Sequence, residues 1–169
     1  MIPGFFDLYR NAENVVTKWA SPENPEGKTG GGGSLMEKEA VFLANLPGWM
    51  KNLFEVMKLP FSPAVKGGGF VFVSGVTCFL DLMTEAPVED IEGQTRETLE
   101  VIKDTLEAAG SCLDKVVNLT VFLRNGEDFS KMNEVYRTFF PEDPPARSTI
   151  VTGLVLPQML VDMECTAIV

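Results

Sequence analysis

The sequence contains no histidine, which removes the commonest general base and the commonest metal ligand of proteins at once. Acid–base chemistry in this chain must therefore come from carboxylates, tyrosine, lysine, cysteine or a bound water. Cysteine is also scarce, since only Cys78, Cys112 and Cys165 occur and none forms a Cys-x-x-Cys pair. Their odd number and wide spacing favour buried thiols in a reducing compartment over a zinc site or a disulfide framework.

Positive charge is in short supply, with 14 Lys and Arg against 24 Asp and Glu and a net charge of −10. Binding to nucleic-acid phosphates or to anionic lipid would work against this field, so we expect neither partner. No apolar run approaches the roughly 18 residues that span a bilayer. The first residues also lack the basic region and cleavage site of a secretory signal. A cytoplasmic location is the default expectation.

What the sequence does contain is typical of a globular protein, with 169 residues of which 45% are hydrophobic and 22% charged. This length predicts one domain and an appendage at about 150 residues per domain. Residues 21–34 are rich in Gly, Pro and Ser and end in four glycines and a serine, a composition typical of a flexible linker. We therefore expect residues 1–35 to be an N-terminal appendage with a Gly-rich linker, and residues 36–169 to be one folded domain.

Hydrophobic periodicity within residues 36–169 predicts an α+β fold. Alternating or β-branched segments predict strands at 39–43, 70–74, 116–123, 148–151 and 160–168. Helical spacing predicts helices at 94–109 and 129–140, and a helical turn or two at 47–57. Long helical crossovers favour parallel strand pairs, and the last two strands are expected to form an antiparallel hairpin. The expected architecture is a mixed β-sheet with two helices packed on one face.

The C-terminal third holds the side chains best suited to chemistry. Arg147 ends a Pro-Pro-Ala-Arg loop, where proline stiffening limits the entropy lost on binding and the guanidinium fork matches a carboxylate or phosphate. Alternation along the last strand places Asp162 and Glu164 on one face. These residues could form an acid that holds a water, facing an arginine that holds an acidic substrate. Taken alone, the residues favour the alternative of a charged edge strand or a structural ion pair with Arg147.

A string of motifs in one order carries a resemblance to a known family. The motifs include Phe61-Ser-Pro-Ala-Val-Lys66, Phe70-Val-Phe-Val-Ser-Gly75, Gln94-Thr-Arg-Glu-Thr-Leu99, Asp128-Phe-Ser-Lys-Met-Asn133, Pro145-Ala-Arg-Ser148 and Leu160-Val-Asp-Met-Glu164. With them the chain resembles the RidA/YjgF family of reactive-intermediate deaminases, also described as endoribonuclease L-PSP-like. The motifs extend over residues 60–168, and residues 36–59 look like the start of one branch of the family.

The resemblance implies a chorismate-mutase-like fold that assembles as a homotrimer with ligand clefts between subunits. It also implies a hydrolase that converts 2-imino or enamino acids, such as 2-iminobutanoate or 2-iminopropanoate, into 2-oxo acids and ammonia without a metal or organic cofactor. Arg147 stands where the family grips the substrate carboxylate, and Asp162 stands where a glutamate orients the attacking water. The other substrate-binding positions that the resemblance implies are Ser74, Gly75, Phe61, Asn133 and Glu164.

Two departures from the family pattern keep other functions open. Phe61 replaces the tyrosine of the deaminase branch, and Asp162 is one methylene shorter than the family's glutamate. Because a displacement of about 1 Å can cost about 10²-fold in rate, these changes predict slow or altered catalysis. The alternative is a non-catalytic trimer that binds 2-oxo acids through Arg147. A ribonuclease is disfavoured by the net charge of −10 and the lack of a basic patch.

Overall fold

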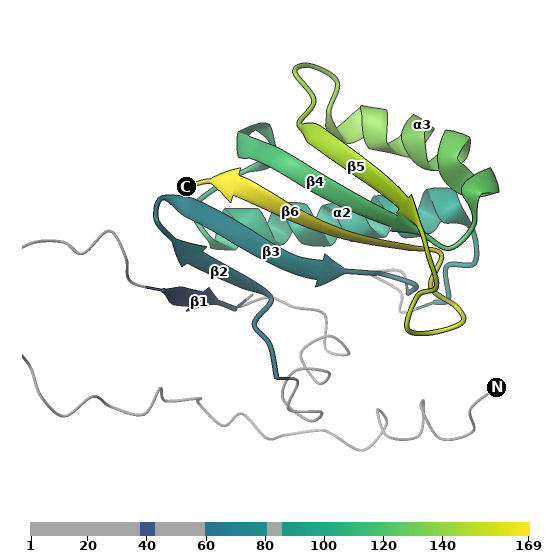
Figure 1. Cartoon of the computed structure of the whole chain (residues 1–169), viewed down its shortest axis with the longest axis horizontal. Coiled ribbons are helices and arrows are strands. Elements are labelled where there is room, and N and C mark those ends of the chain that lie inside the picture. Colours follow the sequence, from purple (N-terminus) through teal and green to yellow (C-terminus); the bar gives the residue numbers. More distant parts are fainter. Residues whose placement is uncertain (1–37, 43–59, 81–85) are drawn as a thin grey trace, which may run out of the picture.

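The computed structural model describes residues 38–42, 60–80 and 86–169, which form one six-stranded sheet with two helices packed on one face (Figure 1). The appendage 1–35 and the helical segment expected at 47–57 lie outside the described residues. The boundary at residue 36 therefore stays a prediction. In the described part, neither helix is long and apolar enough to cross a membrane.

The helices and strands follow the expected order, with one addition. Their bounds are β1 Glu39–Val41, β2 Ala64–Gly67, β3 Phe70–Val76, α2 Ile91–Ala108, β4 Val116–Leu123, α3 Phe129–Phe139, β5 Ala146–Val151 and β6 Val161–Ile168. β2 was not predicted, because only Val65 among its four residues is a strong strand former. Gly68 and Gly69, with φ of 61° and 83°, form the turn between β2 and β3.

The sheet has the order β1-β2-β3-β6-β4-β5. β4 and β5 are parallel, as the crossover through α3 predicts. The prediction that the last two strands form a hairpin is wrong. β6 lies between β3 and β4 and pairs antiparallel with both, whereas β5 lies on the far side of β4. The physical reason is burial. β6 presents Val161, Met163, Cys165 and Ala167 to the core, all at most 4% exposed, whereas β5 is largely exposed and suits the edge.

The core lies between the sheet and α2, which lies behind the strands in Figure 1. Asp90 caps α2 by accepting a hydrogen bond from the Gly93 amide at 2.7 Å, so the helix begins three residues earlier than its apolar spacing indicates. Leu99, Ile102 and Leu106 of α2 are fully buried. Each such side chain contributes about 1.5–3 kcal/mol of burial free energy.

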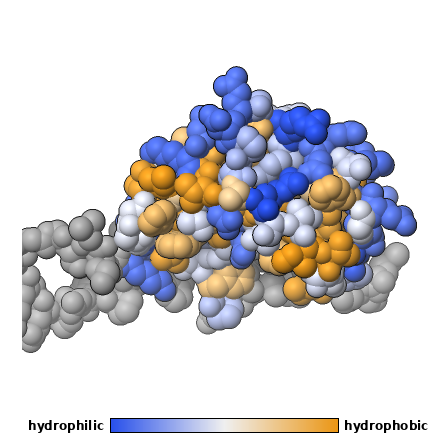
Figure 2. Space-filling view, turned by 45° about the horizontal axis from the view of Figure 1, so that its top comes forward, coloured by the Kyte–Doolittle hydropathy of each residue, from blue (hydrophilic) through white to orange (hydrophobic). Residues whose placement is uncertain are grey.

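The opposite side of the sheet, here called the open face, has no helix over it among the described residues. It exposes large apolar side chains: Phe70, Phe72, Ile150 and Ile168 are 40–49% exposed. Figure 2 shows apolar areas interrupted by polar residues on this side of the molecule. Single apolar residues on a surface are ordinary, but several on one sheet face are typical of an interaction surface.

Candidate functional site

Asp162 lies on the open face, with its carboxylate directly over Gly75 of β3. A Cβ placed on Gly75 would lie 2.9 Å from Asp162 Oδ1 and 3.5 Å from Oδ2. The β3–β6 register shifts between Val73 and Val76, which brings this glycine under the carboxylate. Gly75 and Asp162, both predicted site residues, are therefore in contact although they are far apart in sequence. Any side chain at position 75 would displace the acid.

The environment of Asp162 changes its acidity. Burial raises the pKa of Asp162 from its ordinary value of 3.8 to about 6, and the carboxylate of Glu164 adds to the rise. No lysine or arginine nitrogen of the described residues lies within 4 Å of either carboxylate. A carboxyl group with a pKa near 6 can accept a proton and return it close to neutral pH.

Ser74, another predicted site residue, connects the segment that contains Phe61 to β3. Its hydroxyl donates to the Ser62 carbonyl at 2.7 Å, and its amide donates to the Pro63 carbonyl at 3.0 Å. These two bonds hold the chain just after Phe61 against the end of β3. Phe61 is 49% exposed there. We call Phe61, Ser74, Gly75 and Asp162 the acid half-site.

Arg147 lies on the other face of the sheet. Its register partner on β4 is Leu119, a fully buried residue that faces the helices. The guanidinium carbon is 4.5 Å from the ring centroid of Tyr136 and 6.0 Å from that of Phe129, both on α3. Stacking on an aromatic face contributes about 0.5–2 kcal/mol and holds the guanidinium plane in place. Arg147 is thus oriented by α3 rather than by an acid.

A cleft of about 360 Å³ opens beside this arginine. It is lined by residues of α3, of the following loop and of β5: Asn133, Tyr136, Arg137, Phe140, Pro144, Pro145 and Arg147. We call it the clamp cleft. Asn133 was predicted for the site, whereas Arg137 was missed. The only sequence signal for Arg137 is its position one helical turn after Asn133, on the same side of α3.

The acid half-site and the clamp cleft lie on opposite faces within one chain. Arg147 shares a face with Leu119 and Cys165, whereas Asp162 is paired with Phe122 on the open face. The structural alternatives for Asp162 and Glu164 are wrong as well. β6 is a central strand rather than an edge strand, and no ion pair joins either acid to Arg147. Glu164 shares the open face with Asp162 and is exposed.

The family of this chain follows from its similarity to known proteins. The family model described as endoribonuclease L-PSP matches residues 55–169. The chain belongs to the RidA/YjgF family. Its mixed sheet with two helices is accordingly the chorismate-mutase-like α+β fold of that family, as the sequence predicted.

Three relatives place the chain within the RidA/YjgF family. A RutC family protein of Pyrococcus horikoshii is 38% identical over 130 residues, which cover 77% of this chain and 97% of that protein. The 3-aminoacrylate deaminase RutC of Acinetobacter baylyi is 38% identical over 108 residues, or 64% of this chain and 86% of that protein. A YjgF family structure from Mycobacterium tuberculosis has a TM-score of 0.64 at 28% identity, covering 79% of this chain and all of that one.

The cysteines of this RidA/YjgF chain take no part in either half-site. They form no disulfide, and Cys78 and Cys165 are buried as expected, while Cys112 is partly exposed. Burial raises the pKa of Cys165 to about 12, and Glu164 adds to the rise, so this thiol stays protonated. Within the described ranges, no group of three His, Cys, Asp or Glu side chains is arranged to hold a metal ion.

Proposed function

We propose that this chain is a deaminase that hydrolyses 2-imino acids, such as 2-iminobutanoate and 2-iminopropanoate, to 2-oxo acids and ammonia. The observation that carries the proposal is the Asp162 carboxylate, held over Gly75 with a pKa near 6. The stacked guanidinium of Arg147 supports it, since no carboxylate of the described residues neutralises this arginine. The relative named 3-aminoacrylate deaminase supports the same class of reaction.

We further propose that the active site is completed between copies of the chain in a closed homotrimer. The two half-sites lie on opposite faces, so a head-to-tail contact would bring the clamp cleft of one copy to the acid half-site of the next. The apolar side chains of the open face support this arrangement, because association would remove Phe70, Phe72 and Ile168 from water. One surface would then serve both assembly and catalysis.

In the proposed reaction, Arg147 binds the substrate carboxylate through two parallel hydrogen bonds. The Asp162 carboxylate accepts a proton from a water whose oxygen bonds to the imine carbon, while the π electrons of the C=N bond move to the protonated nitrogen. Asp162 then passes its proton to the nitrogen of the carbinolamine, ammonia leaves, and the hydroxyl proton returns to Asp162 as the carbonyl of the 2-oxo acid forms. Since imines hydrolyse readily in water, modest positioning by Arg147 and Asp162 is sufficient.

An ammonia-release assay tests the proposal directly. Imines are generated in place by an amino-acid oxidase, and ammonia release is followed with and without the full chain. We expect acceleration by the wild type and a strong loss with Arg147→Lys, which keeps the charge but lacks the bidentate fork. Wild-type rates with Arg147→Lys would rule this arginine out as the clamp. Sedimentation of the same variant shows whether the assembly is intact.

The second candidate is a non-catalytic trimer that binds 2-oxo acids. Phe61 favours it, because this residue, which precedes the Ser62 carbonyl bound by Ser74, lacks the hydroxyl of the tyrosine in the deaminase branch. Under this hypothesis 2-oxobutanoate binds through Arg147, yet ammonia release stays at the background rate. The assay and a binding titration therefore separate the two functions.

A further inference from the structure

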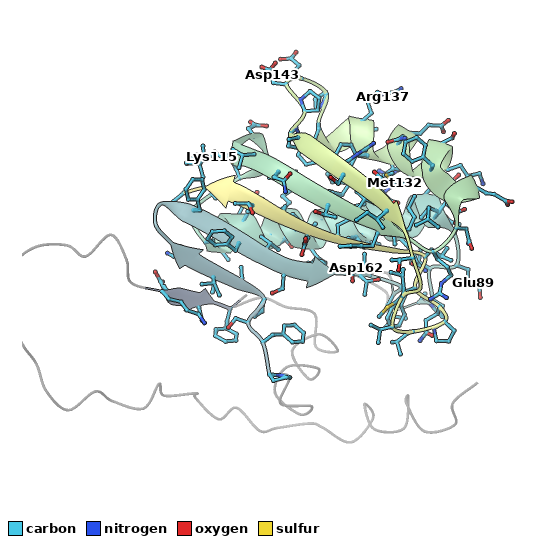
Figure 3. All side chains as sticks on the ribbon, in the orientation of Figure 1. Glu89, Lys115, Met132, Arg137, Asp143 and Asp162 are labelled. Atoms are coloured by element: carbon cyan, nitrogen blue, oxygen red, sulfur yellow. The ribbon has the colours of Figure 1, made fainter. Side chains whose placement is uncertain are left out.

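Arg137 lines the clamp cleft together with Arg147, and the reaction proposed above gives it no task. It lies on α3, one helical turn beyond Asn133, and its side chain projects from the helix in Figure 3. Asp162, by contrast, lies on β6 within the sheet in the same view. Arg137 thus belongs to the half of the site that receives the substrate carboxylate.

Neither arginine of the cleft is neutralised within the described part of the chain. The ion pairs found there all use lysines, namely Lys66, Lys103 and Lys131. None of the residues that line the cleft is acidic. Two guanidinium groups at one small cavity repel each other, and an anion between them relieves that repulsion. This arrangement is unexpected in a chain with a net charge of −10, where acids are abundant.

The size and lining of the cleft limit the anion. Its volume of about 360 Å³ is near the lower end of small-molecule sites, which suits a compact ligand rather than a polymer. Pro144, Pro145 and Phe140 give it apolar walls, and Asn133 adds a neutral polar group. A short carbon chain with a carboxylate at each end matches two guanidinium forks joined by apolar walls.

We infer that the clamp cleft selects 2-imino acids whose side chain ends in a second carboxylate, with Arg147 holding the first carboxylate and Arg137 the second. The inference rests on the proposed deaminase function and names its substrate class. A monocarboxylic substrate leaves Arg137 facing water. Because Arg137 is exposed, its effect is a preference of at most about 5-fold rather than an absolute requirement.

The test uses two stable product-like probes and the full chain. 2-Oxoglutarate carries two carboxylates and 2-oxobutanoate carries one, and each is titrated calorimetrically. We expect the wild type to bind 2-oxoglutarate about 3- to 5-fold more tightly than 2-oxobutanoate. Arg137→Gln should remove this preference, because it weakens binding of 2-oxoglutarate more than binding of 2-oxobutanoate. Arg96→Gln, which removes an exposed arginine from α2 outside the cleft, is the matched control and should keep the preference.

Three results would overturn the inference: equal affinities in the wild type, a preference that survives Arg137→Gln, or an equal loss with Arg96→Gln. If 2-oxobutanoate binds through Arg147 without any such preference, only the substrate class is wrong. If neither probe binds and Arg147→Lys is also silent in the ammonia assay, the proposed function fails together with the inference. In catalysis, Arg137→Gln should raise KM for the imine of glutamate more than KM for 2-iminobutanoate.

Discussion

The carboxylate of Asp162 occupies the place where Gly75 would carry a side chain, with Oδ1 2.9 Å from the ideal Cβ position. This contact joins β3 to β6 across the bulge. A glycine at this point is therefore required by the acid beside it rather than by backbone conformation. The pair provides a direct means of moving the acid without changing its chemistry.

Gly75→Ala should lower ammonia release by about 10- to 100-fold, because displacing a reacting group by about 1 Å has an effect of that size. Stability should change little, since the displaced carboxylate is the end of a side chain that can rotate. Gly67→Ala is the control, because a Cβ at Gly67 meets nothing within 4 Å. Unchanged activity in Gly75→Ala with a normal thermal melt would mean that the position of Asp162 is unimportant.

Asp162→Asn should abolish most hydrolysis, because the amide cannot accept a proton from the attacking water. The wild-type rate should rise with pH around a midpoint near 6, where Asp162 loses its proton. Asp162→Glu should be tolerated and even faster, since it restores the reach of the family's acid. Glu164→Gln is the matched control on the same strand face. If Glu164→Gln abolishes ammonia release and Asp162→Asn leaves it unchanged, Glu164 rather than Asp162 is the catalytic acid.

Stability should depend on pH through the same residue. The pKa of Asp162 rises from 3.8 to about 6 on folding, so between these values the folded chain binds more protons than the unfolded chain. The free energy of unfolding therefore falls as pH rises through this window. The free energy of unfolding of Asp162→Asn, measured relative to wild type, should therefore increase by on the order of 2 kcal/mol between pH 4 and pH 7.

Chemical denaturation at several pH values measures this difference. Asp143→Asn, at an exposed position with a φ of 45° that asparagine tolerates, is the control and should follow the wild-type curve. A constant difference between Asp162→Asn and wild type from pH 4 to pH 7 would contradict the raised pKa.

Tyr136 should act through its ring and not through its hydroxyl. The hydroxyl is buried and has no hydrogen-bond partner in the part of the chain that the structure describes. Tyr136→Phe should therefore raise the free energy of unfolding by between zero and about 1 kcal/mol. The ring remains beneath Arg147, so the Kd of 2-oxobutanoate should not change. Tyr136→Leu removes the aromatic face and should weaken binding about 3- to 10-fold. Equal binding by both variants would show that stacking does not orient Arg147.

Local pattern was enough to predict much of this fold. The alternation of Val161, Met163 and Cys165 against Asp162 and Glu164 is seen as expected. β4 matches its predicted range, because most of its residues are strand formers and a turn follows at Asn125. β2 was missed because four residues are too few to show a period, and the place of β6 was missed because strand order depends on long-range packing.

The candidate site was predictable in its parts and not in its arrangement. Motifs pointed to Arg147 and Asp162, but the face on which each one lies follows from the registers of β5 and β6 against β4. A single residue of register reverses the face, and no local sequence feature fixes it. Arg137 was missed for a related reason: only the return of the chain through the loop at 140–145 brings β5 and Arg147 beside α3.

The central place of β6 has a consequence for synthesis on the ribosome. β3 and β4 are made before β6, yet each pairs with β6, which comes last among the six strands described. Until β6 leaves the exit tunnel, the nascent chain holds a hairpin and a βαβ unit that have no strand between them. The sheet closes, and Asp162 meets Gly75, only after β6 has been made. Chains truncated before β6 therefore lack Asp162 and the strand that pairs with both β3 and β4. We expect such chains to be degraded by proteases.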